Sequence, residues 1–203
     1  MGRKAEALGR YLALGGLLAS VSSASGSGLP AYNRADWPHW IDADGDCQDT
    51  RQEILAANAE CTATCPQETC IVWTDTQECR VQWARWRCPY TGKLLTKPAE
   101  VHIDHLVPLH EAHMSGGAFW PTERRREFAN DVTNLRVVEA ATNVSKGHQR
   151  PDEWLPPVGV CDYVNTWLAV KEKYNLTMTV PEARTVWRER VRCALPEVVS
   201  APP

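Results

Sequence analysis

Asp104 and His105 are adjacent residues in this 203-residue chain whose side chains together could support hydrolytic chemistry. A carboxylate offers a hard oxygen ligand for a metal ion, and an imidazole accepts a proton near neutral pH. Hydrolysis of a phosphodiester needs both, because a base activates the water and a cation neutralises charge on the scissile phosphate and leaving oxygen. An isolated Asp-His pair is more often structural, so the residues around it decide the interpretation.

The segments around this pair follow the order strand, loop, strand, helix. Alternating polarity and β-branched residues indicate the strands, Pro108 ends the first of them, and Gly147 ends the helix. This order is the one that a ββα-metal unit requires. The expected elements are strands at 101–106 and 135–138, short helices between them at 109–115 and 122–129, and a helix at 140–146.

Further motifs accompany the pair along most of the chain after residue 24. They are Asp104–Leu109, Phe128–Asp131, Asn134–Leu135 and Asn143–Gly147, together with Trp37–Cys47, Asp49–Glu53, Pro89–Gly92 and Trp154–Pro157. Each motif is weak alone, but the combination resembles the HNH (His-Me finger) endonucleases, in particular their secreted bacterial and fungal DUF1524-like branch. The resemblance implies an α+β fold with a ββα-metal (His-Me finger) core, added helices and stapling disulfides.

The resemblance also implies a role for each matching residue. Asp104 and Asn143 would be the metal ligands, and His105 would take a proton from the attacking water. Asn134 would tie the loop between the strands and orient the histidine through backbone contacts. Two protein oxygen ligands suit Mg²⁺, or another divalent cation such as Mn²⁺, because such ions keep water and phosphate in their shell.

Basic residues near the motif are the candidates for binding the substrate. Lys146, one turn beyond Asn143, and Arg136 are expected to contact phosphate. The run Arg124–Arg126 is either a solvated helix face or part of the same phosphate-binding rim, and both interpretations stay open.

The start of the chain predicts a secretory signal peptide over residues 1–24. Arg3, Lys4 and Arg10 precede an apolar run of residues 11–21, and small residues follow at Ser22–Ala24. The run is shorter than the ~20 residues of a membrane-spanning helix, so a membrane anchor is disfavoured. We expect a secreted, extracellular monomer with one domain at residues 25–195 and a disordered tail at 196–203.

Eight cysteines behind a secretory signal predict four disulfides, although the spacing of Cys61, Cys65 and Cys70 could be mistaken for zinc ligands. The C-terminal third predicts a helical hairpin, from helical periodicity after Val164 and a second helix opening at Pro181. Cys161 precedes the first helix and Cys193 ends the second. Antiparallel helices would bring these two together, so we expect a Cys161–Cys193 bridge.

Three other patterns suggest a metal site or a modification site, and each has a simpler structural explanation for at least part of it. His110 and His113 are spaced i, i+3, which does not fit the i, i+4 histidines of a zinc protease, so we expect them at a cleft rim or in solvent. The acidic run 42–46 starts like a calcium loop but lacks the distal Glu, which favours a simple turn. Asn143 and Asn175 both head glycosylation sequons, and we expect only Asn175 to carry a glycan.

The function expected from these observations is a secreted, metal-dependent endonuclease that acts on DNA with little sequence specificity; RNA as a further substrate stays open. The formal net charge of −3 is a mild argument against a nucleic-acid partner, since phosphate binding depends on Lys and Arg. One alternative is a catalytically silent secreted effector or binding protein on the same fold. A carbohydrate-binding module, suggested by nine tryptophans, is weaker, because these residues lie mostly beside apolar ones and are expected in the core.

Overall fold

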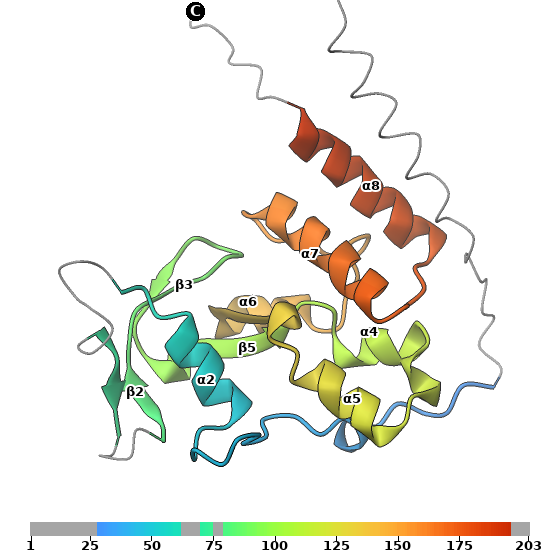
Figure 1. Ribbon diagram of the computed structural model, residues 1–203. Coiled ribbons are helices and arrows are strands. Elements are labelled where there is room, and N and C mark those ends of the chain that lie inside the picture. The colour runs from blue at the N-terminus through green and yellow to red at the C-terminus, as the bar shows by residue number, and fades with distance from the viewer. Residues whose placement is uncertain (1–27, 62–69, 75–78, 196–203) are drawn as a thin grey trace, which may run out of the picture.

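The computed structural model describes residues 28–61, 70–74 and 79–195, so the predicted leader and tail lie outside the described residues (Figure 1). The fold is α+β, as expected. Its helices lie around small antiparallel sheets, and no helix in the described part is long and apolar enough to cross a membrane. The elements before the central strands are the 3₁₀ helix η2 (Arg34–Asp36), α2 (Thr50–Ala57), β1 (Val72–Trp73), β2 (Val81–Trp83), β3 (Trp86–Arg87), β4 (Leu94–Leu95) and the 3₁₀ helix η3 (Pro98–Glu100).

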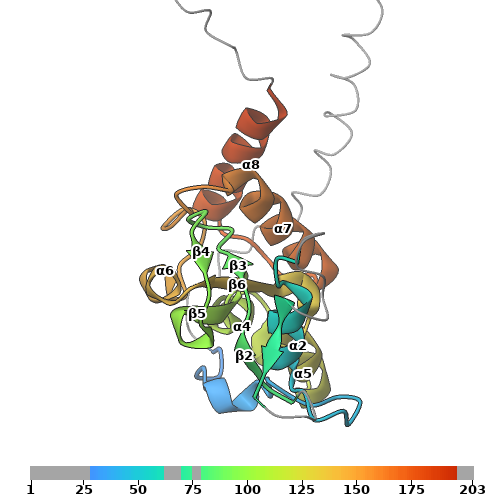
Figure 2. The same ribbon diagram turned by 90° about the vertical axis from the view of Figure 1, so that its left-hand side faces the viewer.

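Two antiparallel strands at the centre, β5 (Val101–His105) and β6 (Leu135–Glu139), occupy the segments expected to be strands. Their register places Asp104 opposite Arg136 and His105 opposite Leu135. Helix α6 (Ala140–Lys146) follows β6 without a loop and packs against both strands (Figure 2). The excursion between the strands contains α4 (Leu109–Met114), η4 (Gly117–Phe119), α5 (Thr122–Ala129) and η5 (Val132–Asn134).

The C-terminal part is the expected helical hairpin of α7 (Val160–Lys173) and α8 (Val180–Ala194), which lie side by side in Figures 1 and 2. Helix α8 starts with a capping box, in which the Thr179 side chain accepts from the Glu182 amide and the Glu182 carboxylate accepts from the Thr179 amide. The Cys161–Cys193 bridge joins the open end of the hairpin. The pairing inferred from two antiparallel helices is therefore present in the structure.

The other cysteines correct the expectation of four disulfides. Cys47 is bonded to Cys79 and Cys61 to Cys70, but Cys88 is a free, fully buried thiol. The Cys88 sulfur accepts a hydrogen bond from the backbone amide of Glu139 at 3.3 Å. This cysteine is therefore part of the core beside β6, and Cys65 lies outside the described residues.

Residues 81–87 form two short strands rather than one continuous strand. Residues 84 and 85 separate β2, which pairs with β1, from β3, which pairs with β4. Fully buried Trp86 directs its indole N–H to the carbonyl of Leu55 on α2 at 2.8 Å. A change of partner strand at this point thus lets Trp86 enter the core. Trp37 and Trp167 are also fully buried, in agreement with a core role for these three tryptophans.

A buried group of charges joins α4 to the C-terminal hairpin. The Lys171 ammonium lies 2.6 Å from Glu111 and 3.2 Å from Glu182, and all three side chains are at most 7 % exposed. Glu182 also accepts the indole N–H of Trp167 at 2.8 Å. Burial raises the pKa of Glu111, and Lys171 opposes this rise. One cation thus stabilises two buried carboxylates from different elements.

We expect Lys171→Met to lower the free energy of unfolding by about 3–5 kcal/mol, because two buried carboxylates lose their cation. Arg87→Met is the control. Its side chain is 55 % exposed and pairs with Glu60, which is 31 % exposed, so its loss should cost less than about 1 kcal/mol. Urea denaturation with intact disulfides measures both values, and equal losses would show that the buried group has no special role in stability.

Candidate functional site

His105 lies at the end of β5 with its imidazole held on two sides. Its Nε2 is 2.8 Å from the carbonyl oxygen of Ala129, the last residue of α5, and its ring stacks on Trp40 with centroids 5.6 Å apart. Burial lowers the pKa of His105 to about 3, so the ring is neutral at physiological pH. Because a carbonyl only accepts, the single ring proton lies on Nε2, and Nδ1 keeps a free lone pair. His105 can therefore accept a proton at Nδ1.

Asn134 holds the turn that follows His105. Its side-chain oxygen accepts from the Val107 amide at 2.8 Å, and its side-chain nitrogen donates to the Val107 carbonyl at 3.1 Å. Its own carbonyl accepts from the Leu106 amide at 2.8 Å. Asn134 is fully buried, so its contacts position the backbone beyond the histidine and do not reach solvent.

Asp104 is buried between two donors. Its Oδ1 accepts from the Lys146 ammonium at 2.9 Å, and its Oδ2 accepts from the Tyr90 hydroxyl at 2.7 Å. Burial raises the pKa of Asp104, while Lys146, Tyr90 and Arg136 act in the opposite direction. Tyr90 belongs to the Pro89–Gly92 turn, and its contact with the carboxylate was not predicted from sequence.

Lys146 does not lie where a phosphate-binding residue was expected. Its side chain is fully buried, and its ammonium contacts Asp104 and, at 3.1 Å, the carbonyl of His105. The helix turn that separates Lys146 from Asn143 points the lysine back at the strand pair. In this arrangement Lys146 is the charge partner of Asp104, and it has no free path to a substrate.

Arg136 also differs from its expected role. Its guanidinium donates to the carbonyls of Thr133 and Leu135 and to the hydroxyl of Thr166 on α7, at 2.9–3.2 Å. These bonds join β6 to the C-terminal hairpin. The side chain is thus committed to structural contacts.

A cavity of about 520 Å³ brings the remaining predicted residues together. Asp104, His105 and Asn143 line it from β5 and α6, whereas Asn134, Lys146 and Arg136 do not. Tyr32 and Arg34 line it too, which was not predicted from the sequence. His110 and His148, whose ring centroids are 4.5 Å apart, complete the polar lining.

The donors at this cavity fit a hard divalent cation. The two oxygens of Asp104 each accept one hydrogen bond from protein and retain a second lone pair. The amide nitrogen of Asn143 lies 3.3 Å from Nδ1 of His102, which leaves the amide oxygen available as a ligand. Since Lys146 already balances the charge of Asp104, a bound cation would depend on water and substrate phosphate for the rest of its shell.

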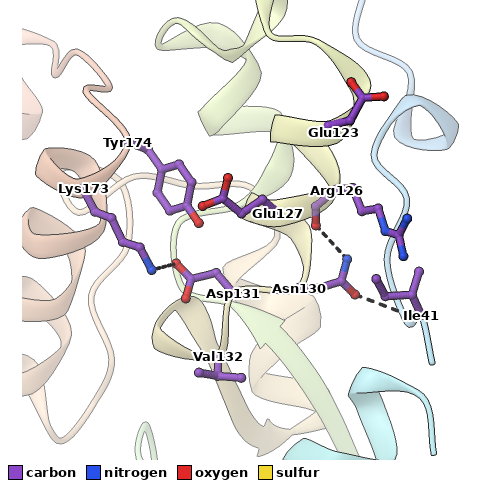
Figure 3. Close-up of a pocket in the computed structure, with 9 residues that line it drawn as sticks. All are labelled: Ile41, Glu123, Arg126, Glu127, Asn130, Asp131, Val132, Lys173 and Tyr174. Carbon is purple, nitrogen blue, oxygen red and sulfur yellow. Dashed lines mark hydrogen bonds and ion pairs between the residues drawn. The ribbon is translucent and has the colours of Figure 1, made fainter. Parts of the chain in front are cut away.

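A second hollow lies beside α5, and His105 does not line it (Figure 3). Two of the polar side chains that line it, Lys173 and Asp131, form an ion pair at 2.8 Å. Asn130 at its edge donates to the Pro38 carbonyl at 2.8 Å and accepts from Thr50 at 3.0 Å. Asn130 thereby ties the segment that carries Trp40 to the end of α5, where the Ala129 carbonyl contacts His105.

Two residues of the arginine run 124–126 form contacts within the protein. Arg124 donates to the Tyr174 carbonyl at 3.1 Å, and Arg125 donates to the Ala118 carbonyl at 2.8 Å and pairs with Asp36. Arg126 lines the second hollow. None of the three lines the cavity of His105, which disfavours the interpretation of this run as part of a phosphate-binding rim.

The two histidines of the 110–113 segment separate. His110 lines the cavity, as expected for a cleft rim. His113 is instead buried, with its Nε2 2.8 Å from the Pro30 carbonyl, so the expectation of a rim or solvent position is wrong for His113.

Asn175 is exposed in the left-handed conformation after α7, and its glycosylation stays a prediction.

The acidic run forms the turn that was expected. Ligand atoms of Asp42, Asp44 and Asp46 lie within 4.8 Å of one another, and all three side chains are exposed. Asp42 accepts from the backbone amides of Gly45 at 2.7 Å and Cys47 at 3.0 Å. These bonds account for the close approach of the carboxylates.

We expect Lys146→Met to destabilise the fold by about 3–5 kcal/mol, because it leaves the buried carboxylate of Asp104 without its cation. The double variant Asp104→Asn/Lys146→Met should regain part of this loss, since no buried charge remains. Lys93→Met, which removes an exposed ion pair with Glu139, is the control and should cost less than about 1 kcal/mol. If thermal and urea unfolding of the Lys146 variant match the wild type, the ion pair does not hold this site together.

Comparison with known proteins places the chain in a family. The family model described as "GmrSD restriction endonucleases, C-terminal domain" matches residues 57–186. A relative named "Uncharacterized secreted protein" from Arthroderma benhamiae is 35% identical over 158 residues, which span 74% of this chain and 70% of the relative. No solved structure matches. The relative confirms the predicted secretion, and the chain is a secreted member of the family of GmrSD restriction endonuclease C-terminal domains.

Proposed function

We propose that this protein is a secreted, metal-dependent endonuclease of the HNH type that hydrolyses phosphodiester bonds of DNA, with His105 as the general base. The observation that carries the proposal is the neutral imidazole of His105, whose Nε2 is committed to the Ala129 carbonyl. Its Nδ1 is therefore the proton acceptor at a cavity that Asp104 and Asn143 also line. Membership of a restriction endonuclease family supports phosphodiester cleavage as the reaction.

In the proposed reaction, Nδ1 of His105 takes a proton from a water molecule as the water oxygen attacks phosphorus. The bond from phosphorus to the leaving oxygen breaks, and that oxygen takes a proton from solvent. The ring becomes positively charged, and the Ala129 carbonyl stabilises that charge because it accepts the Nε2–H. Stacking on Trp40 and the turn held by Asn134 keep the ring oriented. An adjacent phosphate anion favours the protonated ring further, which offsets part of the effect of burial.

Asp104 and Asn143 would hold the divalent cation, Mg²⁺ or Mn²⁺, from the opposite elements β5 and α6. When bound, such an ion supplies positive charge beside the scissile phosphate and the leaving oxygen. Lys146 keeps the Asp104 carboxylate in place through its ion pair. Cleavage of plasmid DNA by the purified protein in Mg²⁺, and its loss in EDTA, tests the whole proposal; no cleavage in either condition would favour a catalytically silent effector.

We expect His105→Ala to lower the turnover of plasmid cleavage by about 10²–10⁴-fold, the usual contribution of a positioned general base. Its affinity for Mg²⁺ should stay near that of the wild type, because Asp104 and Asn143 remain. Gel assays of cleavage and isothermal titration of metal measure the two effects. His110→Ala is the matched control at the same cavity, and a well-folded His105 variant with wild-type turnover would refute the assignment.

We expect Asn143→Ala to weaken metal binding, with activity that recovers as the Mg²⁺ concentration rises. Asn175→Ala, which removes the exposed asparagine of the other sequon, should leave both quantities unchanged. Isothermal titration and cleavage at several Mg²⁺ concentrations compare the two variants. Unchanged metal affinity in the Asn143 variant would exclude this residue as a ligand.

A further inference from the structure

The segment from residue 28 to residue 41 is tied across the excursion between the central strands. The Pro30 carbonyl contacts His113 of α4, Asp36 pairs with Arg125 of α5 at 3.6 Å, and Trp37 is fully buried. In Figure 1 this blue segment runs along α4 and α5. It lies before residue 57, where the family match begins, so this wall of the cavity comes from outside the matched region.

Arg34, in η2 of this segment, is held at the cavity by a histidine. Its Nη2 lies 3.2 Å from Nε2 of His39, and Nδ1 of His39 lies 2.7 Å from the Trp37 carbonyl. The carbonyl only accepts, so Nδ1 carries the proton and donates it; Nε2 then accepts from Arg34. In this arrangement His39 orients the guanidinium, and an imidazole has no negative charge that could cancel the charge of Arg34.

The charge of Arg34 is available to a ligand. Arg34 is exposed and forms no ion pair within the described parts of the chain. Asp104, the carboxylate that lines the same cavity, is balanced by Lys146. The cavity therefore has an excess positive charge beside His105. Such a cavity favours an anion.

We propose that Arg34 binds a backbone phosphate of the nucleic acid next to the scissile one, in the role that the sequence suggested for Lys146 and Arg136. The planar guanidinium matches a phosphate in two-pronged geometry, and one of its nitrogens is already oriented by His39. This inference rests on the proposed nuclease function. It makes the segment before the family-matched region a part of the substrate site.

The test compares Arg34→Gln with Arg184→Gln, which removes an exposed arginine on α8 that does not line the cavity. Fluorescence anisotropy with a labelled 20-base-pair DNA duplex in EDTA gives affinity over a salt series without cleavage. We expect Arg34→Gln to bind about tenfold more weakly at low salt and to reduce the slope of log K against log salt by about 0.9, the value for one phosphate contact. Arg34→Lys should retain the slope, because the charge stays, and Arg184→Gln should match the wild type.

Cleavage assays separate this inference from the nuclease proposal. In Mg²⁺ we expect Arg34→Gln to raise KM more than it lowers kcat. If the wild type cleaves DNA and Arg34→Gln has the KM and salt slope of Arg184→Gln, Arg34 is not a phosphate ligand although the nuclease function stands. If the wild type cleaves nothing but Arg34→Gln lowers the salt slope, the phosphate site stands and the catalytic proposal fails. A wild type that binds no DNA overturns the inference.

Discussion

The buried ion pair between Asp104 and Lys146 is the contact on which the geometry of the cavity depends. A carboxylate and an ammonium removed from water must be paired, because each alone would cost several kcal/mol. Their pairing fixes the last turn of α6 against the end of β5, where the ammonium also contacts the His105 carbonyl. Asn143, one turn earlier on α6, is thereby held at the cavity that His105 lines.

Residues far apart in sequence fix the orientation of His105. The Ala129 carbonyl comes from the end of α5, the stacked Trp40 from the N-terminal segment, and the tie through Asn134 from the end of η5. Asn130 joins the first two of these supports. A histidine with so many fixed neighbours loses little orientational freedom on binding substrate, which is the physical basis of preorganisation at a catalytic site.

Disulfides and buried charges stabilise different parts of the domain. The Cys47–Cys79 and Cys61–Cys70 bridges lie in the irregular part around α2 and the first strands, and Cys161–Cys193 closes the outer end of the hairpin. Contact between that hairpin and α4 instead depends on the buried cluster around Lys171. The thiol of Cys88, close to the central strands, stays unoxidised in the core.

Local patterns in the sequence determined the elements and the catalytic candidates. The β5, β6 and α6 segments, the helical hairpin and its disulfide follow from polarity, turn residues and spacing. Asp104 and His105 stood out by residue type, whereas the role of Asn143 came from the resemblance to the HNH endonucleases. The division of the strand at residues 81–87 was not predictable, because it depends on which partner strand each half meets.

Only the tertiary structure decided which charges are free. Lys146 and Arg136 are close to the motif in sequence, but burial and nearby acceptors use their donors. Arg34 lies seventy-one residues before His105 in the sequence and has an exposed guanidinium at its cavity. A cationic side chain can bind an anionic ligand only where no carboxylate or carbonyl of the protein already uses its donors. That condition depends on packing between distant segments, and no local pattern in a sequence records it.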